Sequence, residues 1–362
     1  LGPTLQCVVS DPISLDKTIM TLRKFSLLSR NSSSSMLSMH RLVQVVLQDN
    51  MLEKIRRLWA ERTVRAINLI LPEVGDFSQW NGCQQYMPHA QSCVTLIETW
   101  KMISPEVARL LEQTGMYLQV QAQYAQANVL FERASTMRTA MREVSLAATV
   151  ASLNHLFWHH CYLGQYILAE QPIWEALKLL QQTPGTEQRS LAVCLGAIAH
   201  LSCLQAKYSQ AEEYFLQALA IYEERVGLQH PSAVCTFSGL GNVSLALAKY
   251  DLAEKFFWDA LNIWQQMPEP QHPLMSATLN GMARLALARG EYEQAELYLH
   301  QERAHLERVL HPSHPTLASN LNDLALLSIA QGKYKQVEPL LKQSLTILEK
   351  SVGLQHPIAG ST

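Results

Sequence analysis

The chain has 362 residues, of which 48% are apolar and 17% are charged, and its net charge is −2. This composition is typical of a folded, water-soluble protein, and the near-neutral charge excludes a general attraction to nucleic acid or anionic lipid. No apolar run approaches the roughly 18 residues needed to span a bilayer. The start, Leu1-Gly2-Pro3, carries no signal sequence, and we expect it to be an internal edge of a longer protein. The seven scattered cysteines favour reduced thiols and a cytoplasmic location.

Residues 1–50 are predicted to form the C-terminal part of a winged-helix domain, because two helical patterns flank a short hairpin pattern. In chain order we expect a helix over 14–24 with Ser14 as its N-cap, strands over 26–30 and 36–39 joined by a turn at 31–35, and a helix from about His40.

Residues 51–104 are predicted to be a helical connector. An amphipathic helix is expected from Glu53 to Leu71, where Pro72 ends it. The following stretch, 77–102, is helical in character, and we expect interruptions near Gly82 and Pro88.

From residue 105 onward the sequence repeats every 42 residues. A tyrosine marks each step, and an alanine follows three residues later in five of the six steps, with Val337 in the last. The tyrosines are Tyr124, Tyr166, Tyr208, Tyr250, Tyr292 and Tyr334. Prolines at Pro231, Pro273, Pro315 and Pro357 keep the same interval, and Pro105 is in register with them. A fixed period of this length predicts stacked copies of one small motif, an architecture that usually binds other molecules.

Each unit is expected to hold two helices. A tight turn such as 330–334 joins them, a glycine such as Gly227 ends the second helix, and a proline such as Pro231 begins the next unit. The six units are 105–146, 147–188, 189–230, 231–272, 273–314 and 315–356.

The residues of the last unit resemble a tetratricopeptide repeat. The matching segments are Leu321-Asn322-Asp323-Leu324-Ala325, Gly332-Lys333-Tyr334 and Val337-Glu338-Pro339-Leu340. The 42-residue length and the His-Pro joints are similar to the kinesin-light-chain type of this repeat. The resemblance implies an all-α fold, a right-handed superhelical solenoid over 105–362.

Within this solenoid the repeated tyrosines and alanines are predicted to be core residues without a binding role. Glu302 and Ser344 depart from the pattern, because the earlier units carry alanine at Ala134, Ala176, Ala218 and Ala260. At these two positions we expect either looser packing or a differently exposed edge.

The resemblance also implies that the first helices line a concave ligand groove. An asparagine row offers donors and acceptors to a peptide backbone, Trp158 offers a stacking face, and Arg284 offers paired hydrogen bonds to a carboxylate or phosphate. The groove candidates, carried over by register, are Asn154, Trp158, His200, Asn242, Asn280, Arg284 and Asn322. A solvated inner face without a dedicated ligand is the alternative.

His155 and His159 are one helical turn apart, a spacing that can chelate zinc. No spaced third ligand accompanies them, so we predict histidines on a helix surface and no metal site.

The segment Ser38-Met39-His40-Arg41-Leu42 resembles the Met-His-Asp segment of NB-ARC proteins, which are nucleotide-switched signalling ATPases of the STAND class. In that family the segment closes the winged helix, and its histidine reaches the β-phosphate of bound ADP. By this resemblance His40 would sense nucleotide, although Arg41 replaces the usual aspartate. The chain has no phosphate-binding Gly-x-x-x-x-Gly-Lys loop, so ADP or ATP with magnesium is expected only with an upstream nucleotide-binding domain of the same polypeptide.

The leading hypothesis is therefore a protein- or peptide-binding sensor module that relays ligand binding to an upstream ATPase switch, with oligomerisation on activation as one outcome. It expects neither a membrane nor DNA as a partner. A second hypothesis is a transcription regulator whose winged helix reads DNA, since residues 1–60 carry a charge of about +4. A third is a passive scaffold or adaptor. An enzyme acting through these 362 residues is the least favoured class, and no catalytic residues are predicted.

Overall fold

The structure is a computed structural model of the chain, and it describes residues 11–30, 37–74, 80–141, 145–183, 185, 187–267 and 274–351. The chain divides into two compact units. One comprises Leu1–Ile70 and His89–Met102, and the other comprises Leu71–Pro88 and Ile103–Thr362. The predicted boundaries at 50 and 104 stay predictions.

The first unit begins with a helix and a small hairpin. Helix α2 spans Pro12–Lys24, and the carboxylate of Asp11 accepts hydrogen bonds from the first-turn amides. Ser14 was expected at this N-cap, but Asp11 lies ahead of a proline at the first helical position, so the helix starts earlier. Strands β1 (Leu28–Arg30) and β2 (Leu37–Met39) pair antiparallel as predicted.

Helix α3 follows the hairpin over Arg41–Asp49. The exposed His40 is its N-cap, and the imidazole Nδ1 accepts a hydrogen bond of 3.2 Å from the amide of Leu42. The turn expected at 31–35 lies outside the described residues. The helix–hairpin–helix order that the sequence predicts is therefore present in the described part.

Two longer helices come next. Helix α4 spans Glu53–Ile70, and helix α5 spans Trp80–Trp100. The expected interruptions at Gly82 and Pro88 are wrong, because α5 runs through both positions. A proline inside a helix removes one hydrogen bond and favours a kink, but it does not oblige the helix to end.

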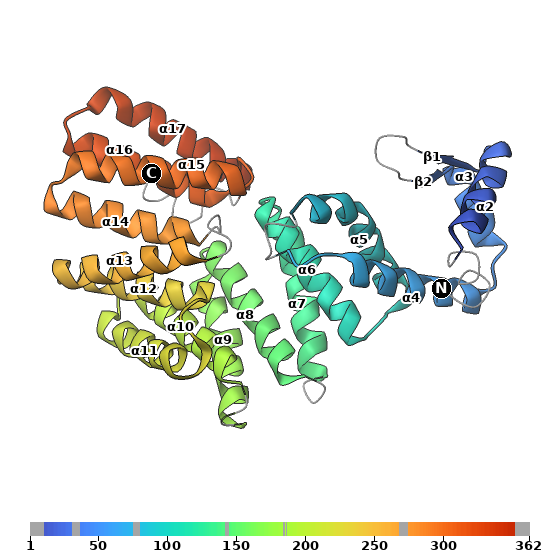
Figure 1. The fold of residues 1–362 in the computed structure, drawn as a ribbon, viewed down its shortest axis with the longest axis horizontal. Coiled ribbons are helices and arrows are strands. Elements are labelled where there is room, and N and C mark those ends of the chain that lie inside the picture. The colour runs from blue at the N-terminus through green and yellow to red at the C-terminus, as the bar shows by residue number, and fades with distance from the viewer. Residues whose placement is uncertain are drawn as a thin grey trace. The chain divides into compact units, whose positions relative to one another are not determined.

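Six helix pairs, one in each 42-residue repeat, form the rest of the second compact unit, and Figure 1 shows them following one another in chain order. This confirms the predicted solenoid. The pairs are α6 (Pro105–Val120) with α7 (Tyr124–Ala140), α8 (Leu146–Tyr162) with α9 (Tyr166–Gln181), α10 (Gln188–Leu204) with α11 (Tyr208–Ile221), α12 (Pro231–Ala246) with α13 (Tyr250–Gln266), α14 (Met275–Arg289) with α15 (Tyr292–Val309), and α16 (Pro315–Ala330) with α17 (Tyr334–Ser351). A π-helical turn, η2 (Tyr222–Val226), extends α11.

A residue with left-handed backbone joins the two helices of every pair. Glycine occupies this position in three units, where it adopts positive φ without steric cost. Alanine occupies it in the other three, which the sequence did not reveal. The six residues, again 42 apart, are Ala122, Gly164, Ala206, Ala248, Gly290 and Gly332.

Two of the joints between units use a histidine that precedes the proline. Gly227 ends the π-helical turn with φ of +96°, and the Nδ1 atom of His230 then accepts a hydrogen bond from the amide of Ser232, at 3.2 Å. His314 caps α16 in the same way. The predicted glycine–proline joint is thus confirmed at Pro231, and the histidine adds the cap. The equivalent Pro273 and Pro357 lie outside the described residues.

The repeated alanines are buried as predicted, but the tyrosines are only partly so. Tyr124 is buried, whereas Tyr250 is 38% exposed and Tyr334 is 70% exposed. The prediction that every tyrosine is core is therefore wrong. Each tyrosine is the first residue of its second helix, at the end of the hairpin, so its burial depends on which segment covers that end. Glu302 and Ser344 are both buried, so neither marks an exposed edge.

The second compact unit, which holds the repeats, curves with the first helix of each repeat on its inner side. Consecutive first helices from α6 to α14 contact one another, while consecutive second helices in the described chain make no comparable contacts. The ring of His314 at the start of α16 lies 5.9 Å from the ring of Tyr162 at the end of α8. Segments four units apart therefore meet across this inner side. We call the surface formed by α8, α10, α12, α14 and α16 the first-helix face.

Candidate functional site

The predicted groove residues lie on the first-helix face, but in different environments. Asn154 and Asn322 are buried, and Arg284 is exposed. Trp158, His200, Asn242 and Asn280 are half-buried. The asparagine row is not continuous, because glycine occupies position 196 and the hydroxyl of Ser238 hydrogen-bonds Thr278 across to the next first helix, at 2.7 Å.

Trp158 and His200 are brought together by the stacking of α8 on α10. Their ring centroids are 4.9 Å apart, and the rings meet edge to face at 81°. The ring of Phe157 lies 5.0 Å from Trp158 and supports it from the core. The two rings therefore form an aromatic contact that is already in place, and the imidazole of His200 adds a polar nitrogen to it.

Several buried polar atoms on this face have no hydrogen-bond partner. Buried polar groups are normally paired, so each unpaired atom indicates a water or ligand that would supply the missing bond. His159 uses Nδ1 to contact the amide oxygen of Gln119 at 3.1 Å, yet its Nε2 is unpaired. The unpaired atoms on α8, α10 and α12 are Ser152 Oγ, Asn154 Oδ1, His155 Nδ1, His159 Nε2, His200 Nδ1 and Asn242 Oδ1.

Burial keeps these histidines neutral. It lowers the pKa of His200 to about 4, and together with the neighbouring His160 it lowers the pKa of His159 to about 4. Burial likewise lowers the pKa of His155. A neutral imidazole offers one donor and one acceptor. This part of the face therefore suits neutral polar groups such as peptide amides better than charged ones.

The opposite end of the face carries charge. Asn280 donates from its side-chain amide to Asp323 at 2.7 Å and to Glu302 at 3.2 Å. Burial raises the pKa of Asp323, and the charge of Arg284, which lies one helical turn further along α14, opposes this shift only in part. Asn280 and Arg284 are thus arranged around two carboxylates, and Asn280 is already engaged.

A second periodic feature lies at the edge where the hairpin turns stack, and our sequence reasoning did not find it. In four units a glutamate four residues after the repeated tyrosine reaches a polar residue at the helix turn of the next unit. Arg289 contacts Glu254 at 2.7 Å, and Lys249 contacts Glu212 at 3.1 Å. The 42-residue spacing of Glu170, Glu212, Glu254 and Glu296 was the available signal.

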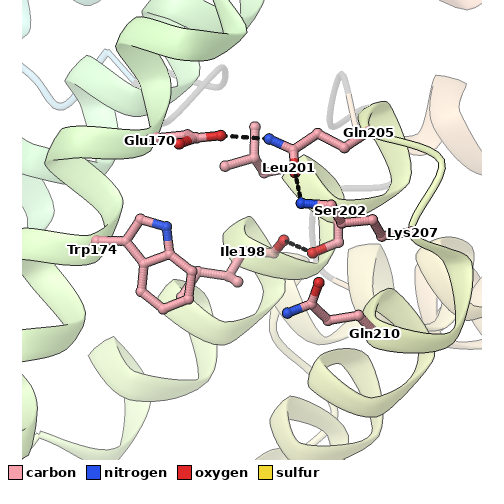
Figure 2. A pocket seen from close by; sticks show the side chains of 8 residues that line it. All are labelled: Glu170, Trp174, Ile198, Leu201, Ser202, Gln205, Lys207 and Gln210. Carbon is pink, nitrogen blue, oxygen red and sulfur yellow. Dashed lines mark hydrogen bonds between the residues drawn. The ribbon is translucent and has the colours of Figure 1, made fainter.

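A cavity of about 130 Å³ lies at this edge, between α9 and the turn that joins α10 to α11 (Figure 2). Gln205 bridges it, because its amide donates to Glu170 at 2.5 Å and accepts from Lys207 at 2.7 Å. The indole of Trp174 forms one side. Because Gln205 already engages both Glu170 and Lys207, the polar lining of this cavity serves the contact between two units. We therefore place the candidate site on the first-helix face.

Among the described residues, no helix is long and apolar enough to cross a membrane, and no three potential metal-ligating side chains gather at one point. His155 and His159 point to other partners: their rings pack against Phe131 at 6.2 and 5.1 Å.

Comparison with known families identifies the repeats. One family model described as tetratricopeptide repeat matches residues 149–224 and 232–304, and a second model with the same description matches 317–358. Together they cover more than half of the chain. No curated protein matches it.

Solved structures share the fold at low sequence identity. The apo form of RapI is 14% identical, with a TM-score of 0.57, over 75% of this chain and 94% of that one. A Rap protein complexed with Competence and Sporulation Factor is 13% identical, with a TM-score of 0.54, over 80% of this chain and 77% of that one. A STAND protein with a tetratricopeptide repeat sensor from Pyrococcus horikoshii is 13% identical, with a TM-score of 0.49, over 94% of this chain and 53% of that one.

Proposed function

Since the chain belongs to the tetratricopeptide-repeat family, we propose that its protein-binding module is the sensor of a nucleotide-switched receptor of the NB-ARC or STAND type. An extended peptide segment of a partner protein would bind along the first-helix face. The observation that carries the binding role is the set of buried but unpaired polar atoms on α8, α10 and α12. A peptide backbone supplies the donors and acceptors that these atoms lack.

The N-terminal segment supports the link to an upstream domain. Helix α3 is amphipathic, yet none of its residues is buried. Leu42 is 68% exposed and Val46 is 58% exposed. An apolar helix face of this kind normally packs against another element. In the proposal it packs on the nucleotide-binding domain, and His40 at the N-terminus of α3 faces the nucleotide.

Ligand binding must favour one state of the switch to transmit a signal. Moving a two-state equilibrium from 1:99 to 99:1 takes a differential binding free energy of about 5.5 kcal/mol, and smaller values suffice when the switch rests partly open. An extended segment contacting several repeats supplies such energies through many modest contacts.

The test uses the full-length native protein. ADP release is measured with and without a partner protein isolated on the immobilised repeats, in the intact protein and after deletion of 105–362. We expect the partner to accelerate release only in the intact protein. Equal acceleration in the deleted form would contradict a sensor role.

A paired substitution tests the N-terminal contact in the same assay. Val46→Ser should raise basal ADP release, because it weakens the apolar contact of α3 without touching the repeats. The matched control is Leu216→Ser, which changes a similarly exposed apolar residue on α11 and should leave basal release unchanged. Equal effects of the two substitutions would argue against docking of α3.

A further inference from the structure

Two carboxylates come together where α14, α15 and α16 meet: Glu302 is buried and Asp323 is half-buried. Glu302 stands on α15, at the position where four earlier units carry alanine, and is only 3% exposed. Its Oε2 accepts hydrogen bonds from the side-chain amides of Asn280 at 3.2 Å and Asn320 at 2.8 Å. The second carboxylate, Asp323, is held by the same amide of Asn280 at 2.7 Å. Thus Asn280 bridges two acidic groups on the first-helix face.

The charges around this pair are unbalanced. Burial, with a smaller contribution from Asp323, raises the pKa of Glu302 to about 7, and burial also raises the pKa of Asp323. Arg284 on α14 attracts Asp323, but its own side chain is exposed to solvent. A buried carboxylate without a close cation is costly, so a bound cation would stabilise the ionised pair.

Asn320 gives an independent indication of a missing donor. It is fully buried, and its amide nitrogen points at Glu302 and at the carbonyl of Leu299. Its Oδ1 atom has no hydrogen-bond partner. The three preceding units hold smaller side chains here, Cys194, Thr236 and Thr278. The last two units therefore combine an unpaired carbonyl oxygen with two carboxylates, which are all acceptors.

We infer that the Asn280–Glu302–Asn320–Asp323 cluster is a subsite for a lysine or arginine side chain of the peptide bound on the first-helix face. This deepens the proposed function and rests on its peptide-binding part. A basic side chain carries several N–H donors and one positive charge, which match the acceptors of the cluster. The neutral histidines and asparagines of α8 and α10 contact the remainder of the peptide. The cluster thereby fixes the peptide's direction along the repeats.

This geometry reverses one sequence expectation about the ligand. Arg284 suggested an anionic ligand group, but in the structure it lies beside Asp323 and partly balances that charge. The ligand's cation would replace this weak, exposed partner. The same end of the face is therefore selective for basic peptides.

The test selects peptides from a random-sequence library displayed on phage, using the complete 362-residue chain as bait. We expect one position to be enriched in arginine or lysine. A synthetic selected peptide should lose about tenfold or more in affinity for D323N, as expected when a charge-assisted hydrogen bond is removed. The Glu338→Gln control changes an exposed carboxylate on α17 and should bind normally. Circular dichroism and the unfolding midpoint check that each variant is folded.

A pH series separates a charge effect from a structural one. Asp323 on α16 is the charged group that acts on Glu302, and Arg284 on α14 acts in turn on Asp323. Affinity of the wild-type chain for the basic peptide should rise as the pH increases through about 7, because Glu302 then becomes anionic. In Glu302→Gln this rise should disappear. Replacing the peptide's basic residue with alanine should remove it as well.

The outcomes distinguish the subsite from the general function. Selected peptides without a basic preference, or an unchanged affinity of D323N, would overturn the subsite and leave peptide binding intact. Competition by magnesium or calcium ions alone would also overturn it, in favour of a metal site. Failure to select any peptide would remove the subsite together with the peptide-binding part of the proposed function.

Discussion

Replacing Glu302 with glutamine should stabilise the repeats at alkaline pH. In the folded chain the pKa of Glu302 is raised to about 7, from an ordinary value of 4.5. The folded state therefore favours the protonated form. Its contribution to stability is fully present below about pH 4.5 and is lost as the pH rises through about 7.

The shift sets the size of the effect. Each pKa unit corresponds to about 1.4 kcal/mol, so ionisation of Glu302 lowers the free energy of unfolding by about 3 kcal/mol at pH 8. Glutamine retains an oxygen that accepts from Asn280 and Asn320, but it carries no charge. Glu302→Gln should thus exceed the wild type by up to about 3 kcal/mol at pH 8 and match it near pH 4.5.

Urea unfolding followed by tryptophan fluorescence measures the difference at the two pH values. Repeat arrays do not always unfold in one step, so the midpoints of the same transition are compared. Other titrating groups are common to both proteins and cancel in the comparison. In the control, Glu338→Gln, a lowered pKa caused by Lys342 predicts no gain at pH 8. A glutamine variant that is no more stable than wild type at pH 8 would refute the reasoning.

Three further predictions concern stability. Gly281→Ala should lower the free energy of unfolding by about 1–3 kcal/mol, because a Cβ there would lie 2.3 Å from the ring of Phe257. Gly196→Ala, where the nearest atom lies 3.9 Å from the Cβ, should be neutral or stabilising in thermal unfolding. Equal shifts would contradict this. Ala248→Gly should raise the free energy of unfolding by about 0.5–1 kcal/mol, because Ala248 has a φ of 56°. Urea unfolding measures the change, and a lowered midpoint would refute the strain argument. His314→Asn should move acid unfolding, followed by circular dichroism, to lower pH. Burial lowers the pKa of His314 to about 4, so the wild-type fold loses stability as the pH falls below about 6.5. Asparagine retains the helix cap, and an unchanged midpoint of acid unfolding would count against this prediction.

The repeat architecture could be predicted from spacing because each unit satisfies the same local rules. Tyrosine, alanine and proline recur every 42 residues, and the six helix pairs follow that register. Local exceptions could not be read in this way. Three left-handed turns use alanine instead of glycine, and helix α5 continues through Pro88. In each case packing of the neighbouring helices outweighs a modest backbone preference.

The candidate site was predictable in register but not in chemistry. The sequence placed Asn280 and Arg284 on the inner helices and suggested that they receive a peptide backbone and an anion. In the structure Asn280 instead holds Glu302 and Asp323, which come from two other helices. Glu302 looked like a simple departure from alanine, because sequence alone does not say which side chains surround it.

The sequence by itself determined the helix pairs, their 42-residue register and the set of residues that the first helices carry, because these depend on local periodicity and on turn and cap residues. Only the tertiary structure decided which polar atoms are left unpaired, that Trp158 meets His200, and that His314 lies beside Tyr162 four units away. Burial and pairing depend on neighbours that stacking brings together from distant parts of the chain. The acidic character of the last two units arises in the same way, from three helices meeting around Glu302.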